Sequence, residues 1–258
     1  MFYIIYINII KMNNLLLEKI KKSIINEIPF SYIVIDDFLP KEYYKIYLES
    51  IPDIKEYDIN ETNTRYYLSK EKHNKIQIMK DINNFFSEEK ILSIICKKFS
   101  KSIEKYINKK YNFQVKNFVS FSSLQKMNND YGCNIHTDGG YQPFTMLYYA
   151  DKENYFNLNL YELKNKTEIY NRFVKKEEVI LKKQVQTSGN KLVIFLDSPN
   201  AYHSITNINS NINIERNMHN IAYYLKENWQ EGKNLFWENK RIDINNWKFD
   251  LYSKKTFI

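Results

Sequence analysis

The sequence predicts an α+β protein in which helices come first and an antiparallel β-sandwich or barrel follows. Apolar residues recur at helical spacing through most of residues 15–111, whereas residues 113–225 contain six runs rich in β-branched and aromatic residues. Short turns with Asn, Gly or Asp separate these runs, and no long crossover helix lies between them, as a parallel sheet would require. The six expected strands are residues 113–126, 144–150, 156–163, 177–186, 191–196 and 217–225.

Length and composition agree with a globular chain. The 258 residues are 43% apolar and 16% aromatic, which allows a substantial buried core. The net charge is +8, but the lysines are spread along the chain, which indicates a solvated surface and no nucleic-acid partner. The apolar N-terminal stretch is shorter than the roughly 20 residues of a membrane helix, so we expect no membrane span.

The chain contains two well-separated cysteines, Cys96 and Cys133. They do not form a disulfide framework, and we therefore expect a reducing, cytoplasmic location. Cys96 lies in an apolar helical run and is expected to be a small buried side chain. Cys133 precedes His136 by three residues, and with no second cysteine nearby we interpret it as a bystander.

The sequence divides into an N-terminal helix or extension (1–28), a main domain (29–225) and a C-terminal extension packed on that domain (226–258). The first part contains a helix at 15–28. Within the main domain we expect, in order, a buried strand at 32–35, a helix at 41–50, a polar loop at 52–67 and a helical insert at 69–111.

The helical insert is expected to contain two helices that meet near residue 87. Ser87 is followed by Glu88 and Glu89, which predicts that Ser87 caps the second helix. His73 also lies in this insert, in a polar stretch, and is expected at the surface.

The pair His136 and Asp138 is the most informative feature of the sequence. One residue separates them, and because side chains alternate along a strand, both point to the same side of an extended chain. A histidine from a second strand would complete two imidazoles and one carboxylate, the donor set of non-haem Fe(II) oxygenases. His203, which follows a predicted strand and a turn, is the candidate for this third ligand. His219 lies three residues after Arg216, so alternation points it away from the Arg216 face, and we expect it to be structural.

Several segments, in order, resemble Fe(II)/2-oxoglutarate-dependent oxygenases of the prolyl-4-hydroxylase-like group, whose core is a double-stranded β-helix, or jelly roll. The resemblance covers roughly residues 29–225 and departs from the family at 154–158, where a Gly-Gly-Glu-like turn is usual. The similar segments are PFSYIVIDDFLP, IHTDGG, FTMLYYAD, GNKLVIFLDSPNAYHSI and ERNMHNIAYYL.

The resemblance implies that His136, Asp138 and His203 are the catalytic iron ligands and that Arg216 pairs with the distal carboxylate of 2-oxoglutarate. It implies Fe(II), 2-oxoglutarate as co-substrate and O₂, with ascorbate as a candidate stimulant. Tyr148 and Gln125, on strands that flank the site, are further candidates for binding 2-oxoglutarate.

The implied reaction hydroxylates an unactivated C–H bond of a polar substrate and releases succinate and CO₂. Halogenation is not expected, because the related halogenases have a small residue at the position of Asp138. An amino acid, a peptidyl residue such as proline, a sugar or a lipid-like molecule would fit as substrate.

Substrate contacts are expected from the loops 58–67 and 151–157 and from the tail with Trp229, Trp237 and Trp247. Two alternatives remain. One is a non-catalytic double-stranded β-helix that binds a ligand or a partner protein. The other is a cupin-like metalloenzyme that does not use 2-oxoglutarate, and Arg216 argues against it.

Overall fold

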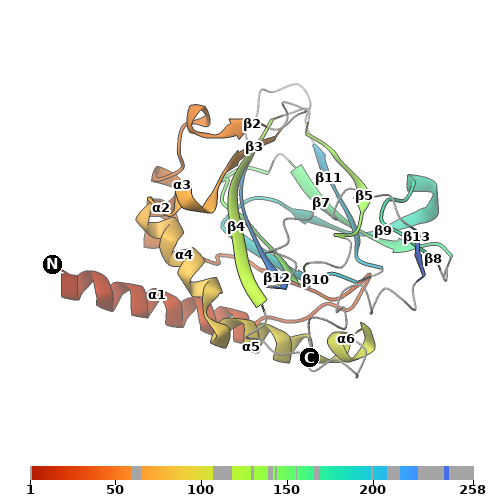
Figure 1. Cartoon of the computed structure of the whole chain (residues 1–258), viewed down its shortest axis with the longest axis horizontal. Helices are drawn as coiled ribbons and strands as arrows, with labels where there is room; N and C mark the ends of the chain where they lie inside the picture. The colour runs from red at the N-terminus through yellow and green to blue at the C-terminus, as the bar shows by residue number, and fades with distance from the viewer. Residues whose placement is uncertain are drawn as a thin grey trace.

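The computed structural model has two antiparallel sheets that pack face to face, with helices covering the outer face of the larger sheet (Figure 1). None of the described helices is long and apolar enough to cross a membrane. The structure describes residues 2–59, 65–106, 118–128, 131–138, 142, 144–154, 156–165, 169–198, 200–207, 216–225 and 241–243.

The larger sheet, which we call the major sheet, has seven strands in the order β1-β10-β6-β12-β4-β3-β2, and each neighbouring pair is antiparallel. Its strands are β1 (Tyr32–Ile35), β2 (Asp58–Ile59), β3 (Arg65–Leu68), β4 (Phe118–Met127), β6 (Phe144–Tyr149), β10 (Lys191–Leu196) and β12 (Arg216–Leu225). The longest ladder joins β12 to β4 over ten residue pairs and sets Arg216 opposite Met127.

The smaller sheet, which we call the minor sheet, has four strands in the order β5-β11-β7-β9. Its strands are β5 (Cys133–His136), β7 (Phe156–Leu163), β9 (Val179–Gln186) and β11 (Tyr202–Asn207), and a further small pair joins β8 (Ile169–Asn171) to β13 (Arg241–Asp243). The β5–β11 register shifts between His203 and Ile205, which marks a bulge beside the predicted ligands.

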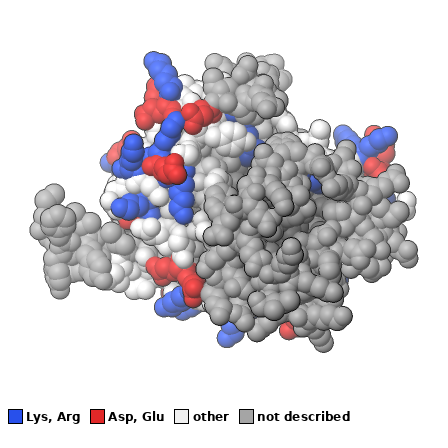
Figure 2. Space-filling model, in the orientation of Figure 1, with Lys and Arg blue, Asp and Glu red and all other residues white. Residues whose placement is uncertain are grey.

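The helices precede most of the strands in the chain. They are α1 (Phe2–Lys22), α2 (Lys41–Glu49), α3 (Lys70–His73), α4 (Gln77–Ser87), α5 (Glu89–Lys98) and α6 (Ser100–Tyr106), with short 3₁₀ turns η1 (Ile54–Glu56) and η3 (Lys176–Glu178). Figure 2 shows Lys and Arg interspersed with Asp and Glu over the described part of the helical face in view. This mixture is that of an ordinary solvated surface.

Alternation along β6 separates the two layers of the core. Phe144, Met146 and Tyr148 pack toward the helices, whereas Leu147 and Tyr149 pack between the two sheets. The inter-sheet layer contains side chains of both sheets, including those of β7, β9 and β11 from the minor sheet. The site described below lies in this inter-sheet layer.

The structure confirms the predicted order of helices before strands, and β7 and β10 have the predicted ends. The strand at 32–35 and the helix at 41–50 are also found, the helix ending one residue earlier than expected. The described part of the helical insert, residues 69–106, contains four short helices rather than two. The first helix ends at Lys22 rather than at residue 28, and the predicted loop 52–67 contains β2 and part of β3.

Two residue-level expectations in the insert are wrong. Ser87 does not cap α5, because its hydroxyl donates back to the Asn83 carbonyl and Ser87 ends α4 instead. His73 is fully buried rather than exposed, since α3 packs against β4 and its ring contacts the Leu68 carbonyl and the Ser122 hydroxyl. The tryptophans of the C-terminal extension lie outside the described residues.

Candidate metal centre

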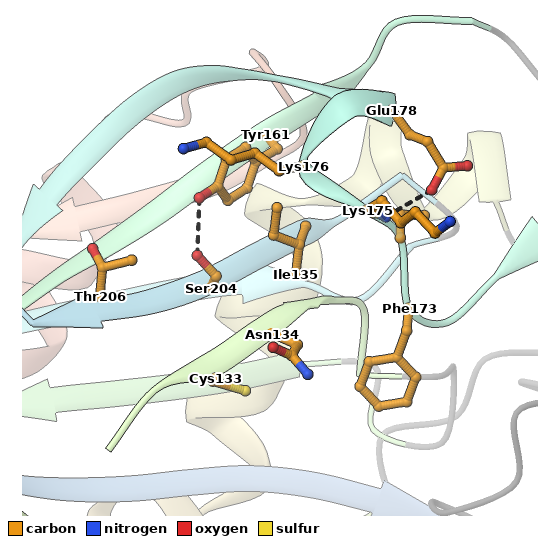
Figure 3. Close-up of a pocket in the computed structure, with 11 residues that line it drawn as sticks. Cys133, Asn134, Ile135, Tyr161, Phe173, Lys175, Lys176, Glu178, Ser204 and Thr206 are labelled. Carbon is orange, nitrogen blue, oxygen red and sulfur yellow. Dashed lines mark hydrogen bonds between the residues drawn. The ribbon is translucent and has the colours of Figure 1, made fainter. Parts of the chain in front are cut away.

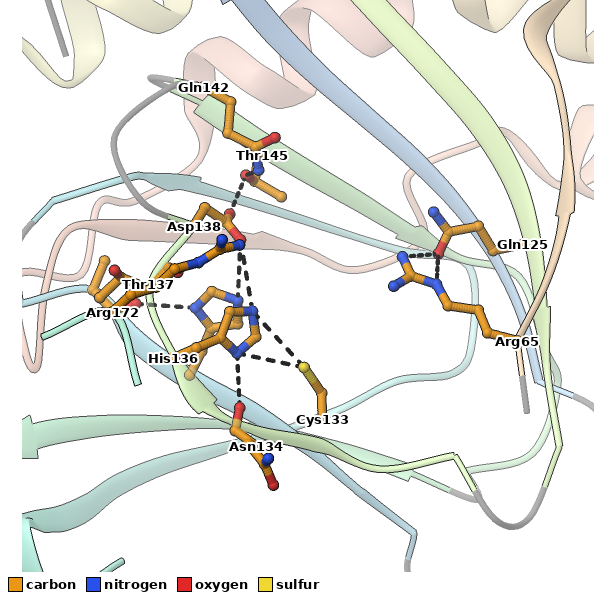
Figure 4. A network of polar contacts seen from close by, with 12 residues as sticks. Arg65, Gln125, Cys133, Asn134, His136, Thr137, Asp138, Gln142, Thr145 and Arg172 are labelled. Carbon is orange, nitrogen blue, oxygen red and sulfur yellow. Dashed lines mark hydrogen bonds and ion pairs between the residues drawn. The ribbon is translucent and has the colours of Figure 1, made fainter. Parts of the chain in front are cut away.

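Two neighbouring strands of the minor sheet position the predicted ligands. His136 is the last residue of β5, Asp138 follows two residues later, and His203 lies in β11 directly opposite His136 in the register. Figure 4 shows His136 and Asp138 turned toward the same space. The three side chains therefore come from two distant parts of the sequence that the sheet brings together.

The three potential donor atoms form a compact cluster. One atom from each of His136, Asp138 and His203 lies within 4.8 Å of the other two. The Oδ1 atom of Asp138 is 3.8 Å from Nε2 of His136 and 3.7 Å from Nε2 of His203. Since metal–nitrogen and metal–oxygen bonds are about 2 Å long, atoms at these separations can surround one ion.

Backbone carbonyls orient both imidazoles. Nδ1 of His136 lies 2.7 Å from the Asn134 carbonyl, and Nδ1 of His203 lies 3.0 Å from the Ala201 carbonyl. A carbonyl oxygen only accepts, so each Nδ1 holds the proton and each Nε2 presents a lone pair toward Asp138. This is the arrangement that fixes the tautomer of metal-binding histidines.

Asp138 is held by a short chain of polar groups. The Thr145 hydroxyl donates to Oδ2 of Asp138 at 2.6 Å, and the Gln142 amide donates to the Thr145 oxygen at 2.6 Å. Burial alone would raise the pKa of Asp138, but the two histidine rings and these hydrogen bonds lower it below its usual value. The carboxylate is therefore ionised at neutral pH.

His136 is neutral at the same pH. Burial, with a smaller contribution from the neighbouring His203, lowers its pKa to about 4, although Asp138 opposes this shift. Two neutral imidazoles and one carboxylate are the donor set that suits a divalent iron ion and leaves coordination positions open.

Cys133, which we interpret from the sequence as a bystander, lies beside a predicted ligand. Its Sγ atom lies 3.4 Å from Nδ1 of His136, and its side chain lines the same cavity. Burial raises the pKa of the Cys133 thiol, which keeps it protonated at neutral pH. Cys96, which we expect to be buried, is half-buried and packs against the helical core.

Arg216 lies in the same cavity and is 1% exposed. Its guanidinium contacts the Met127 sulfur and faces the rings of Tyr131, Tyr149 and Phe156 at 4.9–5.8 Å. Its Nε and Nη1 groups have no hydrogen-bond partner, and no carboxylate of the described residues lies within ion-pair distance. A buried cation with unused donors is costly unless an anion binds to it, so the arrangement indicates an anion site.

The two helper residues lie elsewhere than expected. Tyr148 points to the helical layer, where its hydroxyl donates to the side chain of Asn190, so the structure does not bring it to the cavity. The next residue, Tyr149, faces Arg216 instead, and its buried hydroxyl has no partner. Gln125 lies on the correct face of β4, but it accepts two hydrogen bonds from Arg65 and is not among the residues lining the cavity.

A cavity of about 300 Å³ joins these groups. Apolar side chains from both sheets line its walls. Arg65 comes from the segment 58–67 in which substrate contacts are predicted, whereas Arg172 and Asn220 are lining residues that the sequence did not identify. A wider groove of about 1050 Å³ adjoins it, and Cys133 and Phe173 line both spaces (Figure 3). Tyr161 and Ser204 form a hydrogen bond in the wall of this groove.

Comparison with known proteins identifies the fold. No family profile matches the sequence, and no curated protein matches it. One similar solved structure is a prolyl hydroxylase from Trichoplax adhaerens in complex with a hypoxia inducible factor oxygen degradation domain peptide fragment. It superposes on this chain with a TM-score of 0.52 at 11% sequence identity. The match covers 86% of this chain and 93% of the Trichoplax chain. The Fe(II)/α-ketoglutarate-dependent dioxygenase TqaL superposes with a TM-score of 0.53 at 11% identity and covers 93% of this chain and 97% of its own. The chain therefore has the double-stranded β-helix fold of the Fe(II)/2-oxoglutarate oxygenases, as its resemblance to the prolyl-4-hydroxylase-like group predicts.

Proposed function

We propose that this protein is an Fe(II)- and 2-oxoglutarate-dependent dioxygenase that hydroxylates an unactivated C–H bond of a polar substrate, with release of succinate and CO₂. The observation that supports this function is the convergence of His136, Asp138 and His203 beside a buried Arg216 whose donors are unused. The substrate classes are an amino acid, a peptidyl residue such as proline, or a sugar-like molecule. The similar Trichoplax enzyme is bound to a peptide.

The residues present fit iron. His136 and His203 would each offer Nε2, and Asp138 would offer Oδ1, from one side of the ion. When bound, Fe(II) supplies the one-electron and O₂ chemistry that hydroxylation of an unactivated C–H bond needs. The protein keeps the ligands in position through the Asn134 and Ala201 carbonyls, so little reorganisation is needed for binding.

The residues present also fit 2-oxoglutarate. Arg216 offers Nε and Nη1, and Tyr149 offers its hydroxyl, so three buried hydrogen-bonding groups without partners lie at one end of the inter-sheet layer. A planar guanidinium binds a carboxylate through two parallel hydrogen bonds. The apolar walls formed by Leu147, Leu158 and Phe195 exclude water and strengthen this pairing.

An anaerobic titration tests the proposal. Fe(II) is added to the protein with and without 2-oxoglutarate, and the weak visible charge-transfer band of the chelate is recorded. We expect the band at one equivalent of each and, after exposure to O₂, succinate release. Absence of iron binding would favour the non-catalytic binding protein, and iron binding without the band would favour a metalloenzyme that does not use 2-oxoglutarate.

Arg216 provides an internal control for this titration. In the variant Arg216→Lys, the charge stays but the two-pronged hydrogen bonding is lost. We expect iron to bind as in the parent protein, which also shows that the variant folds, while the 2-oxoglutarate concentration needed for half-saturation rises about tenfold or more.

A further inference from the structure

We propose that Asp151 is a positioning residue for 2-oxoglutarate, because its carboxylate holds the peptide group between Arg216 and Asn217 and so sets where the Arg216 guanidinium meets the co-substrate. This inference rests on the proposed function and deepens it, since it adds a residue outside the cavity to the 2-oxoglutarate site. Asp151 begins the segment 151–157, where substrate contacts are predicted, but it is not among the residues that line the cavity. We therefore expect it to act through Arg216 and not by contact with a ligand.

The backbone ladder between β6 and β12 stops short of Arg216. β12 pairs with β6 only from Met218, which lies opposite Tyr149, whereas its pairing with β4 starts at Arg216, opposite Met127. The first two residues of β12 are therefore paired as a strand on one side only. A strand end of this kind opens more readily than the middle of the strand unless a further contact holds it.

The side chain of Asp151 takes the place of the missing pairing. Its Oδ2 accepts from the backbone amide of Asn217 at 2.7 Å, and its Oδ1 accepts from the side-chain amide of the same residue at 2.8 Å. The backbone nitrogen of Asn217 belongs to the peptide group that joins it to Arg216, so this bond fixes the orientation of that peptide. An ionised acceptor makes a stronger hydrogen bond than a neutral one.

Asp151 is itself held by two neighbouring segments. Its own carbonyl accepts from the Gly189 amide at 2.6 Å, and the carbonyl of Ala150 accepts from the Tyr44 hydroxyl at 2.7 Å. Tyr44 lies in α2, and Gly189 lies in the turn between β9 and β10. The carboxylate is therefore fixed from outside the cavity before it contacts β12.

The charge of Asp151 and its hydrogen bonds affect 2-oxoglutarate in opposite directions. Burial lowers the pKa of the Arg216 guanidinium and Asp151 is among the groups that raise it, so the two charges interact. A negative charge near Arg216 opposes the binding of another anion there. A purely electrostatic role therefore predicts that removing the charge tightens 2-oxoglutarate binding, whereas a positioning role predicts that removing the hydrogen bonds weakens it.

Two variants separate these roles. Asp151→Ala removes both acceptors, and we expect the dissociation constant of 2-oxoglutarate to rise about tenfold. Asp151→Asn removes the charge but keeps an oxygen for the backbone amide of Asn217. In that variant the Asn217 side chain can turn so that its Oδ1, which has no partner in the parent protein, accepts from the new amide. We expect this variant to bind 2-oxoglutarate at least as tightly as the parent.

The charge-transfer band measures binding in the full chain. 2-Oxoglutarate is titrated into protein with saturating Fe(II), without O₂ and at about pH 8, where Asp151 is ionised in the parent because burial raises its pKa only to about 6. Fe(II) affinity is expected to be unchanged in both variants, since Asp151 bonds to none of the proposed metal ligands. Normal Fe(II) affinity also shows that each variant is folded.

Hydrogen exchange gives a second readout that needs neither metal nor 2-oxoglutarate. The Asn217 amide is protected in the parent by its bond to the Asp151 carboxylate. We expect this amide to exchange faster in Asp151→Ala and to stay protected in Asp151→Asn. The amide of Ile221, which pairs with both β4 and β6, should stay protected in all three proteins.

Tyr223→Phe is the matched control for a loss of stability alone. It removes a hydrogen bond from the same strand, between the Tyr223 hydroxyl and the Phe86 carbonyl on the helical side. We expect a lower denaturant midpoint for unfolding and an unchanged dissociation constant of 2-oxoglutarate. If Asp151→Ala does not fold, the milder variant Asn217→Ala, which removes only the side-chain bond, is expected to raise that constant about threefold.

The outcomes separate the two proposals. If the parent gives no charge-transfer band with 2-oxoglutarate, the proposed function is wrong and the inference falls with it. If the band forms but Asp151→Ala, or Asn217→Ala in its place, binds 2-oxoglutarate as the parent does, the proposed function stands and the positioning role is wrong. Binding that is equally weak in Asp151→Asn and Asp151→Ala would also overturn the positioning role.

Discussion

Two pairs of neighbouring histidines lie on opposite sides of the major sheet, and they use their nitrogen atoms in opposite ways. The rings of His136 and His203 are 4.4 Å apart on the inter-sheet side, and those of His73 and His219 are 5.2 Å apart on the helical side. The two rings are close together in both pairs, and the pair on the helical side is the more deeply buried, so neither proximity nor burial alone marks a metal site.

The difference lies in what the nitrogens face. On the helical side, His73 lies between the Leu68 carbonyl and the Ser122 hydroxyl, and Nε2 of His219 lies 3.0 Å from the Asn83 side-chain oxygen. On the inter-sheet side both Nε2 atoms face the carboxylate of Asp138. A pair of histidines becomes a candidate metal site when its lone pairs converge on an anion, and it remains part of the core when its nitrogens bond to neutral groups.

Removing the negative charge of Asp138 should make the His136–His203 pair as poor a metal site as the His73–His219 pair. Asp138→Asn keeps the shape of the side chain but removes its charge, and we expect affinity for Fe(II) or Mn(II) to fall by more than about 100-fold, since even supporting residues outside the ligand set are worth 10–100-fold. Metal titration under anaerobic conditions measures this.

The matched variant for Asp138→Asn is Asn83→Asp, which gives the helical pair a carboxylate. We expect no metal binding there, because Nε2 of His73 is already hydrogen-bonded to the Ser122 hydroxyl in a fully buried site, although residue 83 also contacts this ring. Unchanged affinity in Asp138→Asn would contradict the proposed ligand set.

The sequence predicts the convergence of the three candidate ligands better than it predicts their surroundings. His136, Asp138 and His203 follow from strand alternation and chain order, and the structure brings them together. Tyr148 was misplaced by one position, because alternation specifies two faces without saying which one is inward. The hydrogen bond from Thr145 to Asp138, which only the structure reveals, shows that 145, 147 and 149 lie on the inward face.

The strands β5 and β11 were missed for a related reason. β11 reads YHSITN and lacks a long apolar run, because His203 faces the cavity and Ser204 bonds to Tyr161 on the outer face. The sequence predicts His73 at the surface because its neighbours in α3 are charged, whereas in the structure this one side chain of the helix is buried. Arg65 lies in the segment 58–67, where substrate contacts are predicted, but nothing in the sequence singles it out, and Arg172 has no local pattern at all, since only the fold brings it to the cavity.

Loss of the hydrogen bond that orients Asp138 should weaken metal binding less than loss of the charge of Asp138. Thr145→Val removes the hydroxyl that donates to Oδ2 of Asp138 and leaves the side-chain volume nearly unchanged. We expect metal affinity to fall about 10- to 100-fold. Ser122→Ala removes the corresponding hydroxyl beside His73 and should leave metal affinity unchanged. Equal metal affinities in the two variants would argue against a role for Thr145 in orienting Asp138.

Tyr149 and Tyr148 lie on opposite faces of β6, so removing each hydroxyl in turn tests the two faces separately. Tyr149→Phe removes a buried hydroxyl beside Arg216, and we expect the dissociation constant of 2-oxoglutarate to rise about tenfold. Tyr148→Phe removes the bond to Asn190 and should lower the free energy of unfolding by about 1 kcal/mol without changing 2-oxoglutarate binding. The charge-transfer titration measures 2-oxoglutarate binding, and denaturant unfolding measures stability. Weaker 2-oxoglutarate binding in Tyr148→Phe but not in Tyr149→Phe would mean that Tyr148, rather than Tyr149, binds 2-oxoglutarate.

Of the two histidines on the helical side, His219 should lower the free energy of unfolding as the pH falls. Burial lowers the pKa of His219 well below its usual value, and the nearby His73 lowers it further, so the folded protein keeps this ring neutral while the unfolded chain protonates it near pH 6.5. Below that pH the unfolded state binds the extra proton, and the free energy of unfolding decreases by up to about 1.4 kcal/mol per pH unit for this residue.

The variant His219→Leu isolates this contribution from groups that titrate in the same range. Asp151 is one such group, because burial raises its pKa to about 6, and its ionisation destabilises the folded state as the pH rises. Subtracting the unfolding free energies of variant and parent between pH 4.5 and 7.5, without metal, cancels Asp151. We expect the difference to be largest at pH 7.5 and to shrink as the pH falls. A difference that does not vary with pH would mean that His219 is not held neutral and that the two histidine pairs differ less than their contacts indicate.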